Sequence, residues 1–153
     1  MIKNFQIAVV GLGYVGLPLL CLLSKKFHVK GYDINKEKIK NLNNLLDETK
    51  EVTKNDLRKI KNKIFSSIEC INKSNFFIVT VPTPIDSKNH PDLRFLESAC
   101  KNLAKIIKKG DIVVFESTVY PGLTEEYCGS ILEKNSNLKV NKDFFFRLFT
   151  RKS

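Results

Sequence analysis

Residues 9–20 read VVGLGYVGLPLL, and this stretch decides the fold. Gly11, Gly13 and Gly16 interrupt a run that is otherwise almost wholly apolar. A buried helix would not favour them, since each glycine costs up to about 1 kcal/mol against alanine inside a helix. Their G-x-G-x-x-G spacing directly follows a strand-like run and opens a helical pattern. This order predicts a turn whose backbone approaches a bound group.

Each glycine of the pattern has its own physical reason. Gly11 permits the tight turn out of the strand, and Gly13 leaves room for a pyrophosphate beside the backbone. Gly16 lets the following helix pack close to the sheet. The helix amino terminus then offers N–H groups and a partial positive charge to the phosphates.

An acidic residue completes the pattern. The next predicted strand covers 28–33, so Asp33 ends it twenty residues after Gly13. In a dinucleotide-binding unit such an acid accepts hydrogen bonds from the adenosine ribose, and together the two features predict a dinucleotide site. A carboxylate favours NAD over NADP, because a 2′-phosphate would meet a negative charge. Lys38, five residues after Asp33, carries a positive charge that would weaken this preference for NAD.

Strand-like and helix-like segments alternate along the chain. The predicted strands cover 5–10, 28–33, 67–71, 75–81 and 111–118, with a sixth beginning within 137–146; the helical patterns cover 14–26, 36–46, 53–63, 93–109 and 125–134. Asn35, Asp92 and Thr124 stand where helix caps are expected. Alternation with short connections predicts an α/β fold, a doubly wound parallel sheet of Rossmann-like type with helices on both faces.

Polar residues follow the later strands. Thr83 comes after the strand at 75–81, and Glu116, Ser117 and Thr118 end the strand at 111–118. Ligands of a doubly wound sheet bind beyond the carboxyl ends of its strands, so these side chains and Asp33 are expected at one crevice. Taken singly, such hydroxyls commonly cap turns, and Glu116 is equally suited to a loop ion pair. Their convergence favours a role for Thr83 and Thr118 beside a ribose, a nicotinamide or a water.

Composition narrows the class of protein. The chain has 153 residues and a formal net charge of +10, with its lysines spread along the sequence and no nucleic-acid-binding motif. We therefore interpret the charge as a solvated surface and expect no nucleic-acid partner. The four cysteines show no C-x-x-C spacing, so we expect buried reduced thiols and no metal site. No membrane span or signal peptide is expected, which favours a cytoplasmic protein.

Five motifs together carry a family resemblance. They are GLGYVGLPL (11–19), GYDIN (31–35), DETKEV (47–52), VPTP (81–84) with PDL (91–93), and ESTVYPG (116–122). In this order they resemble the amino-terminal, NAD-binding domain of the UDP-glucose/GDP-mannose dehydrogenase family, most closely the bacterial UDP-N-acetylhexosamine 6-dehydrogenases. Members oxidise C6 of a nucleotide sugar from alcohol to carboxylate with two NAD⁺.

The resemblance also implies residue roles. The main chain of Tyr14 and Val15 would contact the pyrophosphate, and Asp33 and Lys38 would hold the adenosine ribose. Thr83 would touch the cofactor. By the same resemblance, Thr118 would lie beside the nicotinamide and help to position a catalytic water.

The sequence departs from the family pattern after residue 143. There FFFRLFTRKS replaces the family's Tyr/Ser-Pro-Glu-Arg segment, so we expect an NAD-binding domain over 1–143 and a divergent tail over 144–153. The family's central dimerising helix, its catalytic glutamate, lysine, asparagine and cysteine, and its nucleotide-sugar domain have no counterpart here. The resemblance thus implies the cofactor half of a homodimeric enzyme of polysaccharide biosynthesis, truncated and inactive alone.

Two expectations accompany that interpretation. The alternative function is a non-catalytic dinucleotide-binding remnant, or one subunit of a split enzyme. The four phenylalanines within 144–149 are expected to be exposed and to cause self-association.

Overall fold

Short runs of β-branched and aromatic residues form one parallel sheet. The computed structural model describes residues 4–117 and 121–150, with the backbone alone at 117, 121–124 and 150. The strands in these ranges are β1 (Ile7–Val10), β2 (Val29–Tyr32), β3 (Ile64–Phe65), β4 (Phe76–Val79), β5 (Ile112–Ser117) and β6 (Phe145–Thr150). Their order is β3-β2-β1-β4-β5-β6, and every neighbouring pair is parallel. The predicted α/β doubly wound sheet is confirmed.

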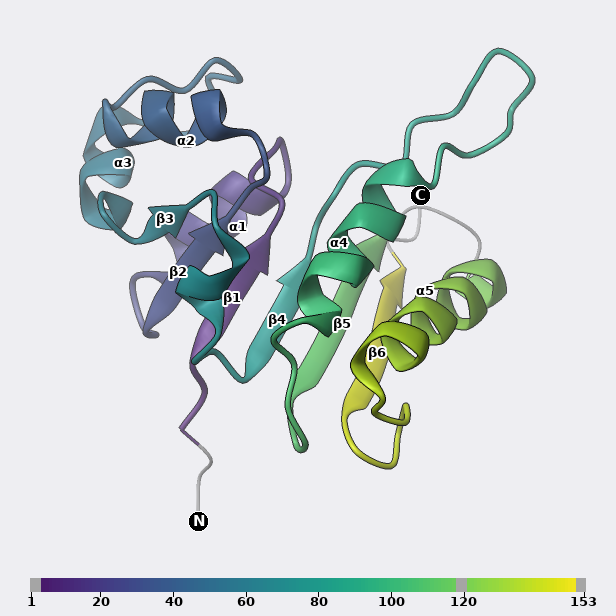
Figure 1. Cartoon of the computed structure of the whole chain (residues 1–153). Helices are drawn as coiled ribbons and strands as arrows, with labels where there is room; N and C mark the ends of the chain where they lie inside the picture. The colour runs from purple at the N-terminus through teal and green to yellow at the C-terminus, as the bar shows by residue number, and fades with distance from the viewer. Residues whose placement is uncertain (1–3, 118–120, 151–153) are drawn as a thin grey trace.

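Helices cover both faces of the sheet (Figure 1). They are α1 (Gly16–Leu23), α2 (Lys36–Asn43), α3 (Lys54–Ile60), α4 (Arg94–Ala104) and α5 (Pro121–Ser136), with a short 3₁₀ helix, η1 (Ile68–Ile71). Successive residues of β1 serve the two faces in turn, as strand geometry requires. Ile7 and Val9 pack with α1, α2 and α3, whereas Ala8 and Val10 pack with α4 and α5. The strand is therefore buried on both sides.

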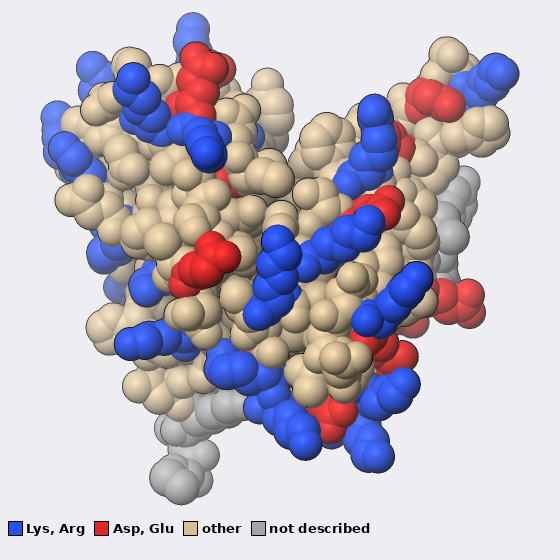
Figure 2. All heavy atoms as spheres, in the orientation of Figure 1, with Lys and Arg blue, Asp and Glu red and all other residues tan. Residues whose placement is uncertain are grey.

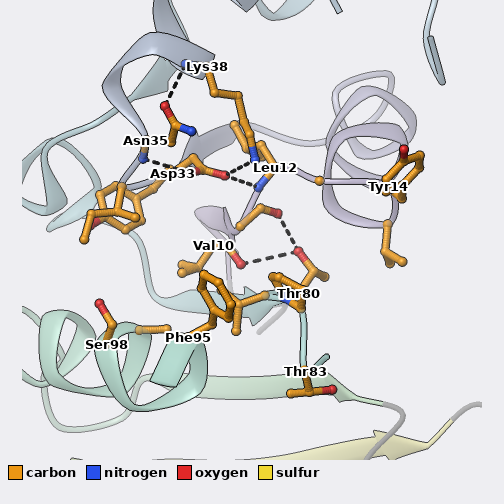
Figure 3. Close-up of a pocket in the computed structure, with 18 of the residues that line it drawn as sticks. Val10, Leu12, Tyr14, Asp33, Asn35, Lys38, Thr80, Thr83, Phe95 and Ser98 are labelled. Atoms are coloured by element: carbon orange, nitrogen blue, oxygen red, sulfur yellow. Dashed lines mark hydrogen bonds and ion pairs between the residues drawn. The ribbon is translucent and has the colours of Figure 1, made fainter. Parts of the chain in front are cut away.

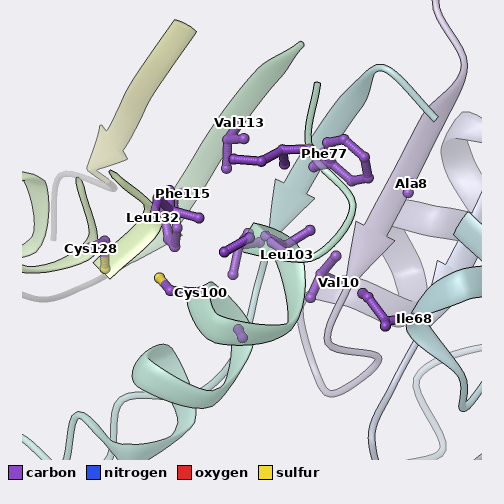
Figure 4. Packing of buried hydrophobic residues seen from close by; sticks show 14 of the residues in the cluster. Ala8, Val10, Ile68, Phe77, Cys100, Leu103, Val113, Phe115, Cys128 and Leu132 are labelled. Atoms are coloured by element: carbon purple, nitrogen blue, oxygen red, sulfur yellow. The ribbon is translucent and has the colours of Figure 1, made fainter. Parts of the chain in front are cut away.

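The core between the sheet and α4 and α5 is the larger of the two (Figure 4). Leu96, Cys100 and Leu103 form the inner stripe of α4, and all are buried. Contact with the thiol of Cys128 on α5, together with burial, raises the pKa of Cys100 far above its usual value. All four cysteines are free thiols, of which Cys70 is the partly exposed one.

The helix starts agree only in part with the predicted caps. Asn35 caps α2, because its Oδ1 accepts the Lys38 N–H at 3.0 Å. At α4 the cap position is Leu93, and Asp92 instead accepts the Arg94 N–H at 3.1 Å from one position earlier. The backbone places Thr124 inside α5, so its predicted capping role is wrong; its side chain lies outside the described residues.

The strand predicted at 67–71 is wrong. Those residues form η1, and the strand that pairs with β2 lies earlier, at Ile64 and Phe65. The spacing explains the difference: Ile68 and Ile71 are three apart and both buried, which a three-residue turn satisfies and an alternating strand does not.

Most of the segment after residue 143 that the structure describes belongs to the sheet, as strand β6. β6 pairs with β5 from Ile112 opposite Phe145 to Ser117 opposite Thr150. Phe144 and Phe146 are buried, and Phe146 stacks on Phe115 with ring centroids 5.0 Å apart. The expectation of four exposed phenylalanines is therefore wrong for these two, because alternation in β6 and the turn before it direct them into the core. Phe145 and Phe149 are exposed.

Candidate functional site

A cavity of about 640 Å³ opens at the carboxyl ends of β1, β2 and β4. Figure 2 shows the surface hollowed in this region, between the lobe that carries α2 and α3 and the lobe that carries α4. The lining residues include Gly11, Gly13, Tyr14, Val15, Asp33, Lys38, Thr49, Thr80, Thr83, Phe95, Ser98, Asn102 and Glu116. Its volume lies within the range of about 300–1,000 Å³ that is typical of small-molecule sites. The edge of the sheet predicted to carry the site therefore does hold a cavity.

The three glycines of the loop are constrained differently. Gly11 has a φ of +98°, a left-handed conformation that favours glycine, and an added Cβ would lie 3.0 Å from Val81. At Gly16 a Cβ would lie 1.8 Å from the carbonyl oxygen of Gly11 and 2.4 Å from Thr80 Oγ1. At Gly13 it would meet no protein atom within 4 Å. Packing thus requires glycine at 11 and 16, whereas at 13 the space beside the backbone is open.

Thr80, which follows β4, holds the glycine loop through a hydrogen bond, a role that the sequence pattern did not indicate. Its hydroxyl donates to the carbonyl of Gly11 at 2.6 Å, and it is buried at the end of β4 (Figure 3). The signal was a single hydroxyl residue in the otherwise apolar strand predicted at 75–81. Thr80 and Gly16 together hold α1 against the strand ends.

Asp33 joins the glycine loop to α2 (Figure 3). Its carboxylate is 8% exposed; Oδ2 accepts the Leu12 N–H at 2.9 Å and lies 3.1 Å from Lys38 Nζ. Oδ1 accepts the Asn35 N–H at 2.9 Å. A carboxylate offers about four acceptor positions, so these three bonds leave little capacity beyond one further donor unless Lys38 moves. The protein itself therefore fixes the orientation of this acid.

The wall opposite the loop comes from α4. Phe95, Ser98 and Asn102 line the cavity at helical spacing, and Asn102 Nδ2 donates to the Tyr32 hydroxyl at 3.3 Å. Burial, with Asp33 and Glu69 nearby, raises the pKa of Tyr32, so its phenol is neutral. The sequence pattern predicted the helix but did not indicate that this polar face lines a site. An aromatic ring with adjacent hydroxyl and amide groups suits a flat, polar ring system.

The loop of 47–52 supplies Thr49 to the cavity, another residue that the sequence analysis did not single out as a site residue. Asp47 holds the loop by accepting the N–H and hydroxyl of Thr49 at 2.9 and 2.6 Å and the Glu51 N–H at 2.9 Å. Burial alone would raise the pKa of Asp47, but these bonds and one from Val52 lower it.

The remaining predicted site residues divide into two groups. Tyr14, Val15, Thr83 and Glu116 line the cavity, with the Tyr14 side chain 70% exposed at its rim. Thr118, and the side chain of Ser117, lie outside the described residues. In the part of the chain that the structure describes, no cluster of histidine, cysteine and acidic residues is fit to hold a metal, and no helix is long and apolar enough to cross a membrane.

Comparison with known proteins gives a consistent group. Residues 5–148 match the model of the UDP-glucose/GDP-mannose dehydrogenase family, NAD binding domain. The chain is 50% identical over 144 residues to UDP-N-acetyl-D-glucosamine 6-dehydrogenase of Pseudomonas aeruginosa, covering 94% of this chain and 34% of the relative. The chain is also 46% identical over 145 residues to the enzyme of the same name from Salmonella typhi, and that match covers 94% of this chain and 34% of the relative.

A solved structure of a UDP-D-ManNAc dehydrogenase from Pyrococcus horikoshii superposes with a TM-score of 0.85 at 33% identity. The match covers 96% of this chain and 36% of that one. The chain therefore spans about a third of the length of the relatives it matches.

Proposed function

Because the chain belongs to the UDP-glucose/GDP-mannose dehydrogenase family and matches its NAD-binding domain, we propose that the cavity at the glycine loop holds the adenosine and pyrophosphate of NAD. The observation that carries this proposal is the position of Asp33. Its buried carboxylate bonds to the loop N–H of Leu12 and lines the same cavity. An acid held there is placed to accept a ribose hydroxyl while the loop receives the phosphates.

The residues around the loop suit a dinucleotide. Gly13 presents backbone with open space beside it, which a pyrophosphate can fill. The amino end of α1 has no side-chain cap and no acidic residue in its first turn, so its N–H groups are suited to an anion. Phe95 and Ser98 on α4 suit the adenine. NAD supplies the hydride-accepting ring, and this chain binds and orients it.

Each site residue receives a role in this proposal. Gly11, Gly13 and Gly16 shape the loop, the main chain of Tyr14 and Val15 contacts the pyrophosphate, Asp33 and Lys38 hold the ribose, Thr83 touches the cofactor, and Thr118 stands beside the nicotinamide. For Lys38 the ion pair with Asp33 supports the assignment. For Thr83 the support is its place on the cavity wall.

We further propose that the complete enzyme oxidises C6 of a nucleotide sugar, most specifically a UDP-N-acetylhexosamine, to the carboxylate, and that it works as a homodimer. The names of the relatives support the substrate class. No cysteine lines the cavity in the described part of the chain, so the residues here serve cofactor binding rather than covalent catalysis. The chain alone is expected to bind NAD without oxidising a UDP-sugar.

Calorimetry with NAD tests the proposal. The folded chain is expected to bind saturably, and Asp33→Ala to weaken binding about 10- to 100-fold, since a hydrogen bond to a charged group contributes about 1.5–3 kcal/mol. Glu37→Ala, which removes the same charge from the exposed side of α2, is the matched control and should bind as the parent does. Circular dichroism establishes that each variant is folded.

Two results would contradict the proposal. Absence of saturable NAD binding by the folded parent chain points to a non-catalytic remnant. Steady NADH formation from the purified chain with UDP-N-acetylglucosamine would refute the restriction to cofactor binding. A split enzyme is indicated if turnover appears only when a second polypeptide is added.

A further inference from the structure

A second cavity lies at the other end of the sheet. It has a volume of about 260 Å³ and is lined by Gln6, Ile7, His28, Val29, Lys30, Asn62, Lys63, Phe65, Lys73 and Ser74. Ile7 and Val29 are the first residues of β1 and β2, so this cavity opens at the amino ends of the strands. The cofactor cavity is at their carboxyl ends, and the two share no lining residue.

The charge of this second cavity has one sign. Lys30, Lys63 and Lys73 line it together with His28, and no aspartate or glutamate does. None of these four takes part in an ion pair among the described residues. Positively charged residues that line one small space favour an anion there, because each attracts it.

Two of the lining residues are held in place by the fold. Lys30 Nζ donates to the carbonyl of Cys70 at 3.1 Å and lies 5.8 Å from the centre of the Phe65 ring. A lysine anchored in this way loses less side-chain entropy when an anion arrives than a fully mobile one does.

Ser74 supplies an uncommitted donor. The residue is 3% exposed; its N–H donates to Ile71 and its carbonyl accepts from Lys108 Nζ at 3.3 Å, so its backbone is fixed. No described residue hydrogen-bonds to its hydroxyl. In the described part of the chain, every fully enclosed side-chain polar atom has a hydrogen-bond partner. Because the Ser74 hydroxyl has none, it is not fully enclosed in the core. A hydroxyl on so buried a residue is normally paired, and Ser74 is one of the residues that line the cavity.

We propose that this cavity is a binding site for a phosphate group, either inorganic phosphate or the phosphate of a small monoester. Lysine binds phosphate as a point charge, and a serine hydroxyl donates to a phosphate oxygen. The volume is below the roughly 300 Å³ at which drug-sized ligand sites begin, which fits a phosphate with few further atoms. This assignment is independent of the cofactor site.

Binding is measured on the full chain by amide NMR titration with inorganic phosphate and, separately, with glucose 1-phosphate. The expected result is saturable shifts at Ile7, Val29 and Ser74. The double variant Lys63→Ala/Lys73→Ala should weaken binding about tenfold or more, since each lost charge-assisted contact contributes more than about 1 kcal/mol. Ser74→Ala should weaken it by a smaller factor. NAD affinity should stay unchanged in all variants.

The control is Lys134→Ala/Lys139→Ala, which removes the same two charges from exposed positions at and beyond the end of α5. It should bind phosphate within about twofold of the parent, because isolated exposed charges contribute little. Equal weakening in both double variants would overturn the proposal, since it shows general attraction to a basic protein. Shifts confined to the glycine loop, or no saturation with either ligand, would also overturn it. Tighter binding of glucose 1-phosphate identifies a phosphorylated small molecule, and equal affinity identifies the phosphate group alone.

Discussion

Gly13→Ala and Gly16→Ala make the same chemical change three residues apart, and we expect the first to weaken NAD binding and the second to lower the stability of the fold. An alanine Cβ at 13 meets no protein atom within 4 Å, whereas at 16 it would lie 1.8 Å from the Gly11 carbonyl oxygen. The first substitution should therefore leave the fold intact and obstruct the phosphate position. The second should destabilise the fold by pushing α1 away from the strand ends.

The sizes follow from the contacts. At Gly16 the nearest neighbours are the Gly11 carbonyl and the Thr80 hydroxyl, which donates to that carbonyl, so neither can move away easily. Overpacking of this kind costs about 3 kcal/mol, against which alanine's helix propensity returns up to about 1 kcal/mol. A net loss of about 2 kcal/mol lowers Tm by about 4–8 °C in a domain of this size. Gly13→Ala should stay within about 0.5 kcal/mol of the parent.

Thermal unfolding by circular dichroism gives the stabilities, and calorimetry with NAD gives the affinities. Gly13→Ala is expected to lose NAD affinity at least tenfold at unchanged Tm, because a methyl group there excludes the pyrophosphate from the backbone. If Gly13→Ala binds NAD as the parent does, the loop is not the phosphate site. If Gly16→Ala has the same Tm as the parent, the close approach of Gly16 to the Gly11 carbonyl and the Thr80 hydroxyl is not as described.

Three further predictions concern charge and exposure. Asp33→Asn should improve the affinity for NADP relative to NAD about tenfold, and adding Lys38→Ala should reverse that gain; calorimetry with both cofactors measures the two affinities. If adding Lys38→Ala leaves the NADP/NAD affinity ratio unchanged, Lys38 does not lie at the ribose. Iodoacetamide should label Cys70 first in the native protein and the three buried cysteines much more slowly or not at all, because burial shields them and raises the pKa of Cys21 to about 11. Mass spectrometry reports the order. Burial would raise the pKa of Asp47, but the loop hydrogen bonds outweigh it and lower the pKa below its unfolded value of 3.8. The stability that Asp47 contributes is therefore present above that pH and is lost as the pH falls through the folded pKa. Thermal melts between neutral and acid pH should show a smaller fall in Tm for Asp47→Asn than for the parent.

The elements with strong local patterns were predictable from sequence. β1, β4 and β5 are largely apolar runs that end in or before glycine or polar residues, and the alternation of strands and helices with short connections predicted the parallel, doubly wound sheet. The glycine loop with Asp33 located the cavity, because loop, strand end and acid share one edge of the sheet. Predicted ends were less reliable: α4 stops at Ala104, before the expected 109.

The failures came from tertiary context. At 67–71 a β-rich composition hid a three-residue spacing, and only packing of Ile68 and Ile71 decided for η1. Thr80 was missed because its hydroxyl bonds to a carbonyl 69 residues away, which no local pattern reveals. The exposure of the segment after 143 was misjudged because burial of Phe146 depends on pairing with β5.

Asp33 shows why the fingerprint of this fold works as one unit. The acid is normally explained by its bond to ribose, yet its carboxylate also accepts the Leu12 and Asn35 N–H groups of the protein itself. Contacts within the protein thus help to shape the loop, and a loop held in its binding conformation has a smaller ordering cost on binding. Asp33→Ala then removes both loop support and ribose contact, whereas Asp33→Asn retains an acceptor and removes the charge. Comparing the two variants separates charge from hydrogen bonding. Equal losses of NAD affinity would assign the effect to the charge, and a larger loss in Asp33→Ala would assign the difference to the hydrogen bonds that the side chain accepts.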